Sequence, residues 1–222
     1  MIRRPPRSTP SNSSAASDVY KRQADIFAAA WYHRKAQWQH IFRLLGFAFI
    51  GILVATWTLD KINDQQLKPI IGLIVLALAA AGTWNNHRKS AHLRYDRNSC
   101  AGRWIFAAVF GFLAGYTTMM ANAAGPIMII YLLAVGLDKF EFVGTMAWFF
   151  FIVNWLKVPF QSRLDMITAD SLKLDACLFP LVLIGAVCGI LLVKGIPQKL
   201  FNNVVTVLAA GAAIWMVVSY FI

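Results

Sequence analysis

The chain is divided into apolar segments of 14 to 20 residues that alternate with short polar stretches. A membrane-spanning helix needs roughly 20 apolar residues. A backbone in lipid must also satisfy its own hydrogen bonds, which favours helices over strands. Charged residues make up only 14% of the chain, whereas a soluble domain carries about 25%. The sequence therefore predicts an all-α, polytopic integral membrane protein whose surroundings are a lipid bilayer.

Seven of the apolar segments are candidates for membrane helices. They are Leu44–Leu59, Pro69–Trp84, Trp104–Ala121, Ala123–Gly136, Phe142–Val158, Ala176–Val193 and Asn203–Ile222. Before them, Ala24–Tyr32 is too short to span, and we expect it to be the end of a helix. Ala123–Gly136 has only 14 residues and contains a Gly–Pro pair near its start. It is either a short tilted span, a re-entrant segment or half of a broken helix.

The first 23 residues differ from the rest of the chain. Residues 1–23 are rich in Arg, Pro and Ser and contain no apolar run, so they do not form a secretory signal. The segment resembles translated adapter sequence joined to an incomplete gene. The alternative is a natural disordered basic tail. On either interpretation we expect 1–23 to pack against nothing.

An internal repeat is also predicted. IGILVA at 50–55 matches CGILLV at 188–193, and each is followed by a short polar turn and an apolar helix. Upstream, Asp25 of the first copy corresponds to Asn154 of the second. We expect two repeated helical halves, of which the first is incomplete. The predicted divisions are a remnant of the first membrane repeat at 24–84, a basic loop at 85–103 and the second repeat at 104–222.

Residues 1–23 carry +4 of the formal net charge of +11, and the remaining +7 comes from basic residues in loops. Segments 33–43 and 85–103 are strongly basic, whereas acids balance the lysines of 60–68. Lys and Arg favour cytoplasmic loops, so 33–43 and 85–103 should share the cytoplasmic side, with 60–68 opposite. The distribution of Lys and Arg does not decide the side of the C-terminus. Basic and aromatic residues do not interleave as in a nucleic-acid groove, so we expect no nucleic-acid partner.

Enzymatic motifs are missing from the sequence. The GxSxG, HExxH, P-loop and GxGxxG patterns are absent. The four histidines fall in predicted loops, which gives no intramembrane pair for a metal or haem, and the three cysteines are scattered. We therefore predict no enzyme, no metal and no cofactor. The histidines are His33, His40, His87 and His92.

Polar residues at membrane depth surround the Gly–Pro pair. Thr117, Thr118 and Asn122 come directly before Gly125 and Pro126. If a half-helix starts near Pro126, capped by Asn122 or a neighbouring small residue, its N–H groups and positive dipole end would bind an anion. Transporters use such discontinuous helices near the middle of the membrane. The alternative is ordinary packing with a proline kink.

Three further residues are candidates for the same site. Asn154 and Lys157 lie three positions apart, on one helical face, within an apolar segment. Ionisable residues inside a membrane are costly and are functional candidates by default. Lys157 either contributes to the site or extends to the membrane interface. Asp25 is either a site residue of the first copy or a charge at a helix end.

Upstream of these residues, Ala107, Gly111 and Gly115 recur every four positions. Small residues at this spacing let two membrane helices approach closely. The sequence therefore predicts a tight helix–helix contact along this stripe.

The block TTMMANAAGPIMIIYLLAVGLDKFEFVGTMAWFFFIVNWLKVPF at 117–160 resembles the second-half signature of the TauE/SafE sulfite-exporter family. The resemblance continues in ADIFAAAWYHRKAQW at 24–38 and QLKPIIGLIVL at 66–76. It implies duplicated membrane halves and a multi-pass protein of the bacterial inner membrane that transports small sulfur-containing or carboxylate anions. The opening helix and Gly-rich first-half motif of the family are absent from this sequence.

Two functions remain from these observations. The first is a secondary transporter that exports a small anion such as sulfite, a sulfonate or a related organic acid. The second is a membrane structural or assembly protein without transport activity. Transport requires the polar residues to converge, whereas a scaffold would scatter them. A homo-oligomer is compatible with both.

Overall fold

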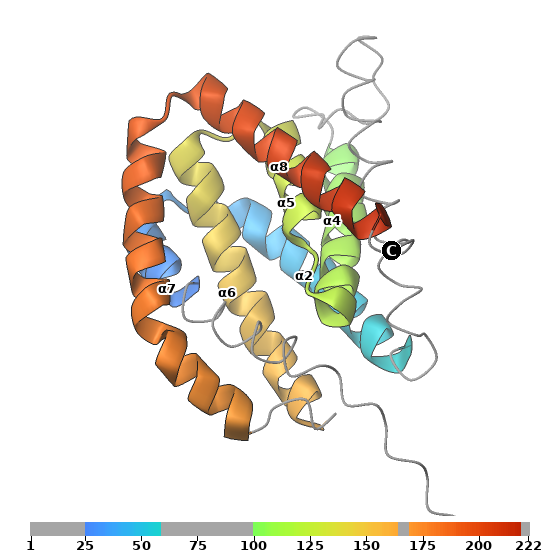
Figure 1. The fold of residues 1–222 in the computed structure, drawn as a ribbon. Helices are drawn as coiled ribbons and strands as arrows, with labels where there is room; N and C mark the ends of the chain where they lie inside the picture. The colour runs from blue at the N-terminus through green and yellow to red at the C-terminus, as the bar shows by residue number, and fades with distance from the viewer. Residues whose placement is uncertain (1–24, 59–99, 164–168, 219–222) are drawn as a thin grey trace, which may run out of the picture.

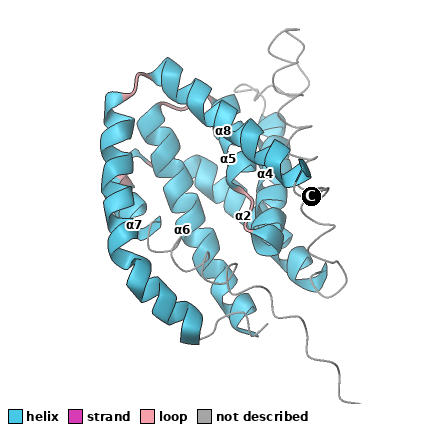
Figure 2. Cartoon of the chain, in the orientation of Figure 1, coloured by secondary structure: helices cyan, strands magenta, loops and turns pink. Residues whose placement is uncertain are grey.

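The computed structural model describes residues 25–58, 100–163 and 169–218, and its regular structure in these ranges is entirely helical (Figures 1 and 2). A short helix over 25–31 and the 3-10 turn η1 (His33–Lys35) come first. The remaining helices are α2 (Trp38–Thr58), α4 (Cys100–Ala121), α5 (Gly125–Val135), α6 (Lys139–Arg163), α7 (Ala169–Gly195) and α8 (Gln198–Val218). The segment 1–23, Pro69–Trp84 and most of the basic loop 85–103 lie outside the described residues.

Three of the described helices are long and apolar enough to cross a membrane, namely α2, α4 and α6. This agrees with the predicted all-α membrane protein. The helices start earlier than predicted, since α2 begins at Trp38 instead of Leu44 and α6 at Lys139 instead of Phe142. Hydropathy marks only the part of a helix that matches the hydrocarbon core, and a helix continues into polar residues beyond that depth.

The tightest contact in the molecule joins α2 to α4. A Cβ atom added at Gly111 would lie 2.7 Å from the carbonyl oxygen of Leu44, and one added at Gly115 would collide with the backbone of Ala48. Ala107 is fully buried one turn earlier. The predicted stripe of small residues therefore lets the two backbones touch. Gly111 lies against Leu44, and Gly115, four residues later, lies against Ala48, which is also four residues later. The helices α2 and α4 therefore run in the same direction.

The path through α4, α5 and α6 crosses the bundle three times. Lys157 near the end of α6 contacts Thr118 near the end of α4, and both helices descend in the view of Figure 1. The chain must therefore return between them through α5 and its two flanking loops. α5 ends at Gly136, whose φ of 75° is left-handed and whose N–H donates to the carbonyls of Leu132 and Leu133. With 11 residues, α5 is shorter than the three helices that are long enough to cross a membrane, so the choice between a short span, a re-entrant segment and half of a broken helix stays a prediction.

The junction between α7 and α8 lies beside the start of α6. The Lys139 ammonium donates to the carbonyls of Lys194 and Ile196 at 3.1 and 2.6 Å. The side chain of Gln198 accepts from the Lys139 N–H at 2.7 Å. These bonds satisfy carbonyls at the end of α7 that have no partner inside the helix, so they fix where the chain turns into α8.

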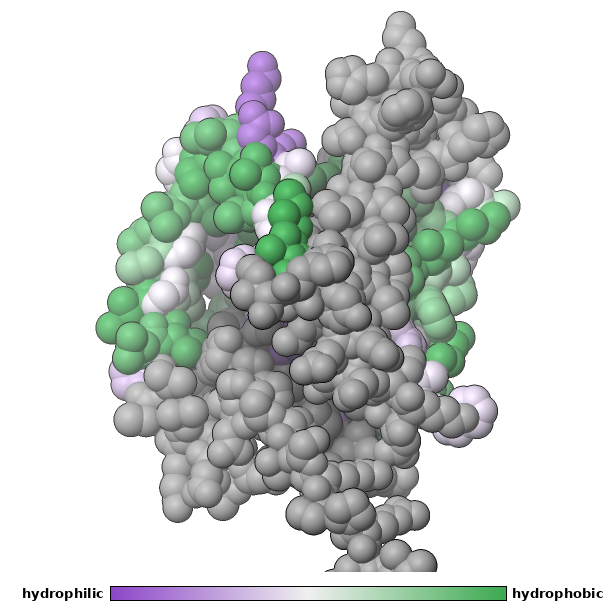
Figure 3. Space-filling view, turned by 45° about the vertical axis from the view of Figure 1, so that its right-hand side comes forward, coloured by the Kyte–Doolittle hydropathy of each residue, from purple (hydrophilic) through white to green (hydrophobic). Residues whose placement is uncertain are grey.

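The outer surface of the described helices is apolar. Figure 3 shows hydrophobic side chains over most of the described surface on one face. On α7 and α8, Leu181, Ile184, Val207 and Trp215 are each more than 60% exposed. A soluble monomer rarely exposes so much contiguous apolar surface, and this surface suits the acyl chains of a bilayer.

Candidate functional site

A break in the backbone separates α4 from α5. Asn122 has a φ of 52°, which is the left-handed conformation that glycine and, more rarely, asparagine adopt after a helix. Its N–H donates to the Thr118 carbonyl at 3.1 Å, and the N–H of Ala123 donates to the Thr117 carbonyl at 3.3 Å. These two bonds close the end of α4, and the chain then starts α5 after only three residues.

The start of α5 is not capped by a side chain. Its N-cap residue is Ala124, no side-chain cap bond is formed, and Pro126 lies in the first turn. Of the two predicted N-cap residues, Asn122 or a neighbouring small residue, the structure has the small residue, Ala124. The first backbone hydrogen bond of α5 runs from the Met128 N–H to the Ala124 carbonyl. The N–H groups that precede Met128 in the first turn therefore have no carbonyl partner within the helix.

Lys157 is buried inside the bundle. Its side chain is 1% exposed, and its ammonium donates to the Thr118 carbonyl at 3.3 Å, the Thr118 hydroxyl at 3.3 Å and the side-chain oxygen of Asn122 at 3.4 Å. The side chain therefore points into the bundle and not onto its outer surface. Lys157 ties α6 to the break that follows α4.

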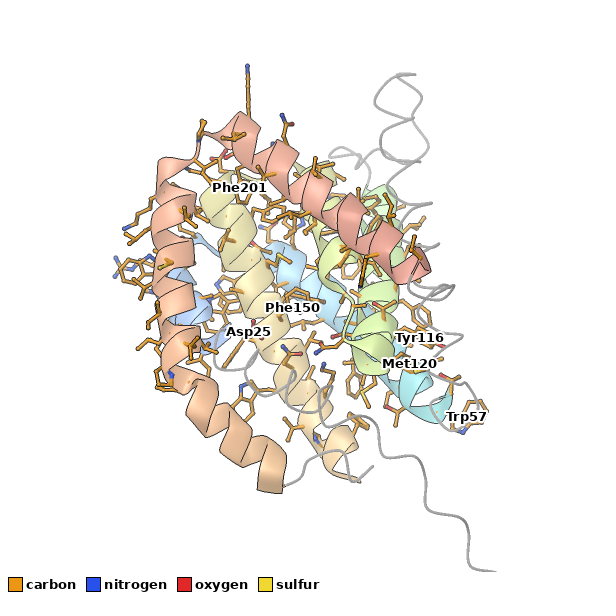
Figure 4. All side chains as sticks on the ribbon, in the orientation of Figure 1. Asp25, Trp57, Tyr116, Met120, Phe150 and Phe201 are labelled. Carbon is orange, nitrogen blue, oxygen red and sulfur yellow. The ribbon has the colours of Figure 1, made fainter. Side chains whose placement is uncertain are left out.

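Asn154 and Asp25 form a second polar contact on the same face of α6. Asn154 is 5% exposed, and its side-chain amide donates to the Asp25 carboxylate at 2.6 Å. Figure 4 shows Asp25 beside α6. Because Asn154 precedes Lys157 by three positions, the two contacts are neighbours along α6. The structure thus brings together Asp25, Thr118, Asn122, Asn154 and Lys157.

Thr117 is fully buried, but its hydroxyl donates to the Leu113 carbonyl of its own helix at 2.7 Å. Its side chain is therefore used within α4. Gly125 is partly exposed, and a Cβ atom added there would have nothing within 4 Å. Space is therefore open beside the first turn of α5.

With this geometry in view, the sequence model of the sulfite exporter TauE/SafE family matches residues 10–216. The chain belongs to the TauE/SafE family. The match covers most of the chain and includes part of the segment 1–23 that the sequence analysis set apart. No curated protein and no solved structure gives a significant match.

The TauE/SafE candidate site lies toward one end of the bundle. Thr118 is two positions from the end of the apolar span Cys100–Met120, and Lys157 is three positions from the end of Lys139–Phe160. The sequence predicts a site near the middle of the membrane, but the described helices place this cluster within one turn of the ends of both spans. Asn154 lies one turn deeper.

His40 is a polar residue that the sequence analysis assigned to a loop. It lies in the first turn of α2, and its Nδ1 atom is 3.0 Å from the Tyr131 hydroxyl of α5. Tyr131 is fully buried and packs against Phe106 and Phe110 of α4. The prediction of a loop failed because α2 begins earlier than its apolar run. His33 lies in η1.

The described residues do not form an acidic or histidine-rich ligand set. Among them, no group of three His, Cys, Asp or Glu side chains is arranged to hold a metal ion. The chemistry of the site is that of one buried ammonium, one carboxylate, amides, a hydroxyl and backbone N–H groups.

Proposed function

We propose that the chain is a secondary transporter that exports a small anion, such as sulfite, a sulfonate or a related organic acid, across the bacterial inner membrane. The family and the apolar helices support a membrane transporter. The observation that carries the proposal is the buried Lys157 ammonium beside the break between α4 and α5.

The anion would bind at this break. Lys157 supplies a positive charge where water is scarce, and charge interactions are strong in such surroundings. The Thr118 hydroxyl accepts from Lys157, and its own proton is left to donate, since a hydroxyl has one donor and two acceptor positions. The N–H groups at the start of α5 add donors and the positive end of a helix dipole.

The arrangement also favours transport over a purely structural role. A scaffold would scatter its polar side chains, whereas Asn154 and Lys157 of α6 meet residues from two other segments. Residues from 25–31, α4 and α6 are thereby joined at one place. The same donors suit sulfite, sulfonates and carboxylates, so the proposal is for this class of small oxyanions.

Anion flux through proteoliposomes that contain the purified chain tests the proposal. We expect sulfite efflux above that of empty liposomes, and at least tenfold less efflux with Lys157→Met. Lys199→Met is the matched control because Lys199 is exposed on α8, and its flux should be unchanged. Equal flux from the Lys157→Met and wild-type chains would contradict the proposal, as would wild-type flux no higher than that of empty liposomes.

Gly125→Val gives an independent test of where the anion passes. A side chain at this position meets no atom within 4 Å, so the substitution should leave the fold intact and fill the open space beside α5. We expect most of the flux to be lost and the melting temperature to be unchanged. Unchanged flux would exclude this space from the anion path.

A further inference from the structure

The ligands around the Lys157 ammonium are those of a cation site. The backbone carbonyl of Thr118, its hydroxyl and the amide oxygen of Asn122 are neutral oxygen atoms, all within 3.4 Å of Nζ. Carbonyl oxygens at the ends of interrupted helices are groups with which transporters coordinate coupling cations. An ammonium group has the charge of a monovalent cation and binds to the same oxygen ligands, to which it donates hydrogen bonds.

The backbone at the end of α4 holds these oxygens in place. The left-handed conformation of Asn122, with φ of 52°, ends the helix. The Thr118 carbonyl lies in the last turn of α4, where it accepts from the Asn122 N–H at 3.1 Å and also from the Lys157 ammonium. The C-terminal end of a helix carries partial negative charge and favours a cation. The oxygens thus belong to α4 and its break, whereas the charge comes from α6.

We propose that the Lys157 ammonium is the permanent cation of an oxygen site at the end of α4, and occupies a position that a free monovalent cation would take if the side chain were removed. The Thr118 carbonyl, the Thr118 hydroxyl and the Asn122 amide oxygen are neutral ligands. As a consequence for transport, which rests on the proposed function, the step that uses this position requires no free Na⁺ or K⁺.

The binding chemistry can be tested without transport, by the thermal stability of the purified chain. Lys157→Ala removes the ammonium and leaves the oxygens. We expect methylammonium chloride or ammonium chloride to raise the melting temperature of the Lys157→Ala chain by about 5 °C when the cation is present at about 100 times its dissociation constant. Choline chloride at equal ionic strength is the control. The wild-type chain, whose site is filled, should show no such shift.

The double variant Lys157→Ala, Asn122→Leu is the matched control, because it lacks one of the ligands. The double variant should need at least a tenfold higher cation concentration to reach the same rise in melting temperature. A Lys157→Ala chain that none of ammonium, methylammonium, K⁺ and Na⁺ stabilises would overturn the proposal. Equal stabilisation of the Lys157→Ala and wild-type chains would overturn it as well.

A second comparison applies if Lys157→Ala does not fold. Lys157→Met retains most of the side-chain volume but carries no charge. Thr118→Val should lower the melting temperature of the wild-type chain and leave that of the Lys157→Met chain unchanged or raised, because the hydroxyl then has no ammonium to bind. If Thr118→Val lowers the melting temperature equally in the wild-type and Lys157→Met chains, the cation site is refuted.

The transport consequence has its own measurement. Replacing Na⁺ and K⁺ by choline should leave wild-type flux unchanged, and methylammonium should restore part of the flux lost in Lys157→Ala. Flux that depends on Na⁺ or K⁺ in the wild-type chain would disprove the consequence. If the wild-type chain shows no anion flux at all, the proposed function fails, while the stability measurements still decide the cation site.

Discussion

Two buried tyrosines differ in what their hydroxyl groups contact. Tyr32, in the turn before η1, is 4% exposed, and its hydroxyl has no hydrogen-bond partner among the described residues. Burial raises the pKa of Tyr32, so this hydroxyl stays protonated at neutral pH. Tyr131 is also buried, but its hydroxyl lies 3.0 Å from Nδ1 of His40. The buried hydroxyl group therefore destabilises the protein at Tyr32, whereas at Tyr131 it links α2 to α5.

Replacing each tyrosine by phenylalanine should change stability in opposite directions. A buried polar group without a partner costs about 1–3 kcal/mol, and a made hydrogen bond contributes about 1 kcal/mol. We expect Tyr32→Phe to raise the free energy of unfolding and Tyr131→Phe to lower it, each by about 1 kcal/mol. Unfolding of the detergent-solubilised variants measures both. Equal losses in the two variants would contradict this account.

The bond between Asn154 and Asp25 gives a second prediction for single residues. A hydrogen bond to a charged group contributes about 1.5–3 kcal/mol, and this one joins α6 to the 25–31 helix. Asn154→Leu should therefore destabilise the chain and reduce anion flux. In a double-mutant cycle with Asp25→Ala, we expect a coupling energy of at least 1 kcal/mol. Additive effects of the two substitutions would show that the contact is not used.

The sequence identifies the polar residues of the candidate site but not their partners. Asn154 and Lys157 stand out because ionisable and amide groups are rare in membrane segments. That Asn154 meets Asp25, and that Lys157 meets Thr118, depends on how distant segments pack, which local patterns do not record. The sequence also leaves open whether Asn122 or a neighbouring small residue caps α5. In the structure Ala124 takes that position, and the left-handed backbone of Asn122 ends α4.

At the scale of helices, the small residues of α4 show how composition sets geometry. A side chain larger than hydrogen at Gly115 would collide with the backbone of Ala48, and backbone atoms cannot rotate away as a side chain can. The stripe was readable from the sequence because its period is helical. Its partner α2 was not, because any apolar helix is a candidate partner.

Gly115→Ala should therefore separate α2 from α4. Overpacking costs about 1–3 kcal/mol, and here the colliding atoms belong to the backbone, so we expect the upper part of this range. Gly185→Ala on α7 is the matched control, because its Cβ atom would meet nothing within 4 Å. Thermal unfolding of both variants measures the difference. If Gly115→Ala is as stable as Gly185→Ala, the close contact is not present in the protein.

At the scale of the whole molecule, several basic residues of the described segments lie at one end of the bundle. The turn with Arg34 and Lys35 precedes α2 and lies beside the first third of α6, where the Gln37 N–H donates to the Thr145 hydroxyl. Lys139 and Lys194 lie at the same end. The predicted cytoplasmic side of 33–43 would place this end of the bundle in the cytoplasm, since Lys and Arg favour cytoplasmic loops.

Cysteine labelling in intact cells tests this topology. In a chain without its three native cysteines, Arg34→Cys and Lys199→Cys should be protected from a membrane-impermeant maleimide. Trp57→Cys, at the far end of α2 and 75% exposed in the described structure, should be labelled. Permeabilised cells provide the control, because all three positions should then react. Labelling of Arg34→Cys and Trp57→Cys from the same side would show that α2 does not cross the membrane.

The backbone contact between α2 and α4 limits how the bundle can move. Helices whose main chains touch cannot slide past each other without first separating, so this pair moves as a rigid body. The Lys157 contacts lie where α4 ends, at a three-residue connection to α5. A change in access from one membrane face to the other must then use rotation at 122–124, where the backbone already departs from the helix. If the chain transports as proposed, we expect the backbone to rotate at this break, and the contacts of Lys157 with Thr118 and Asn122 to oppose that rotation.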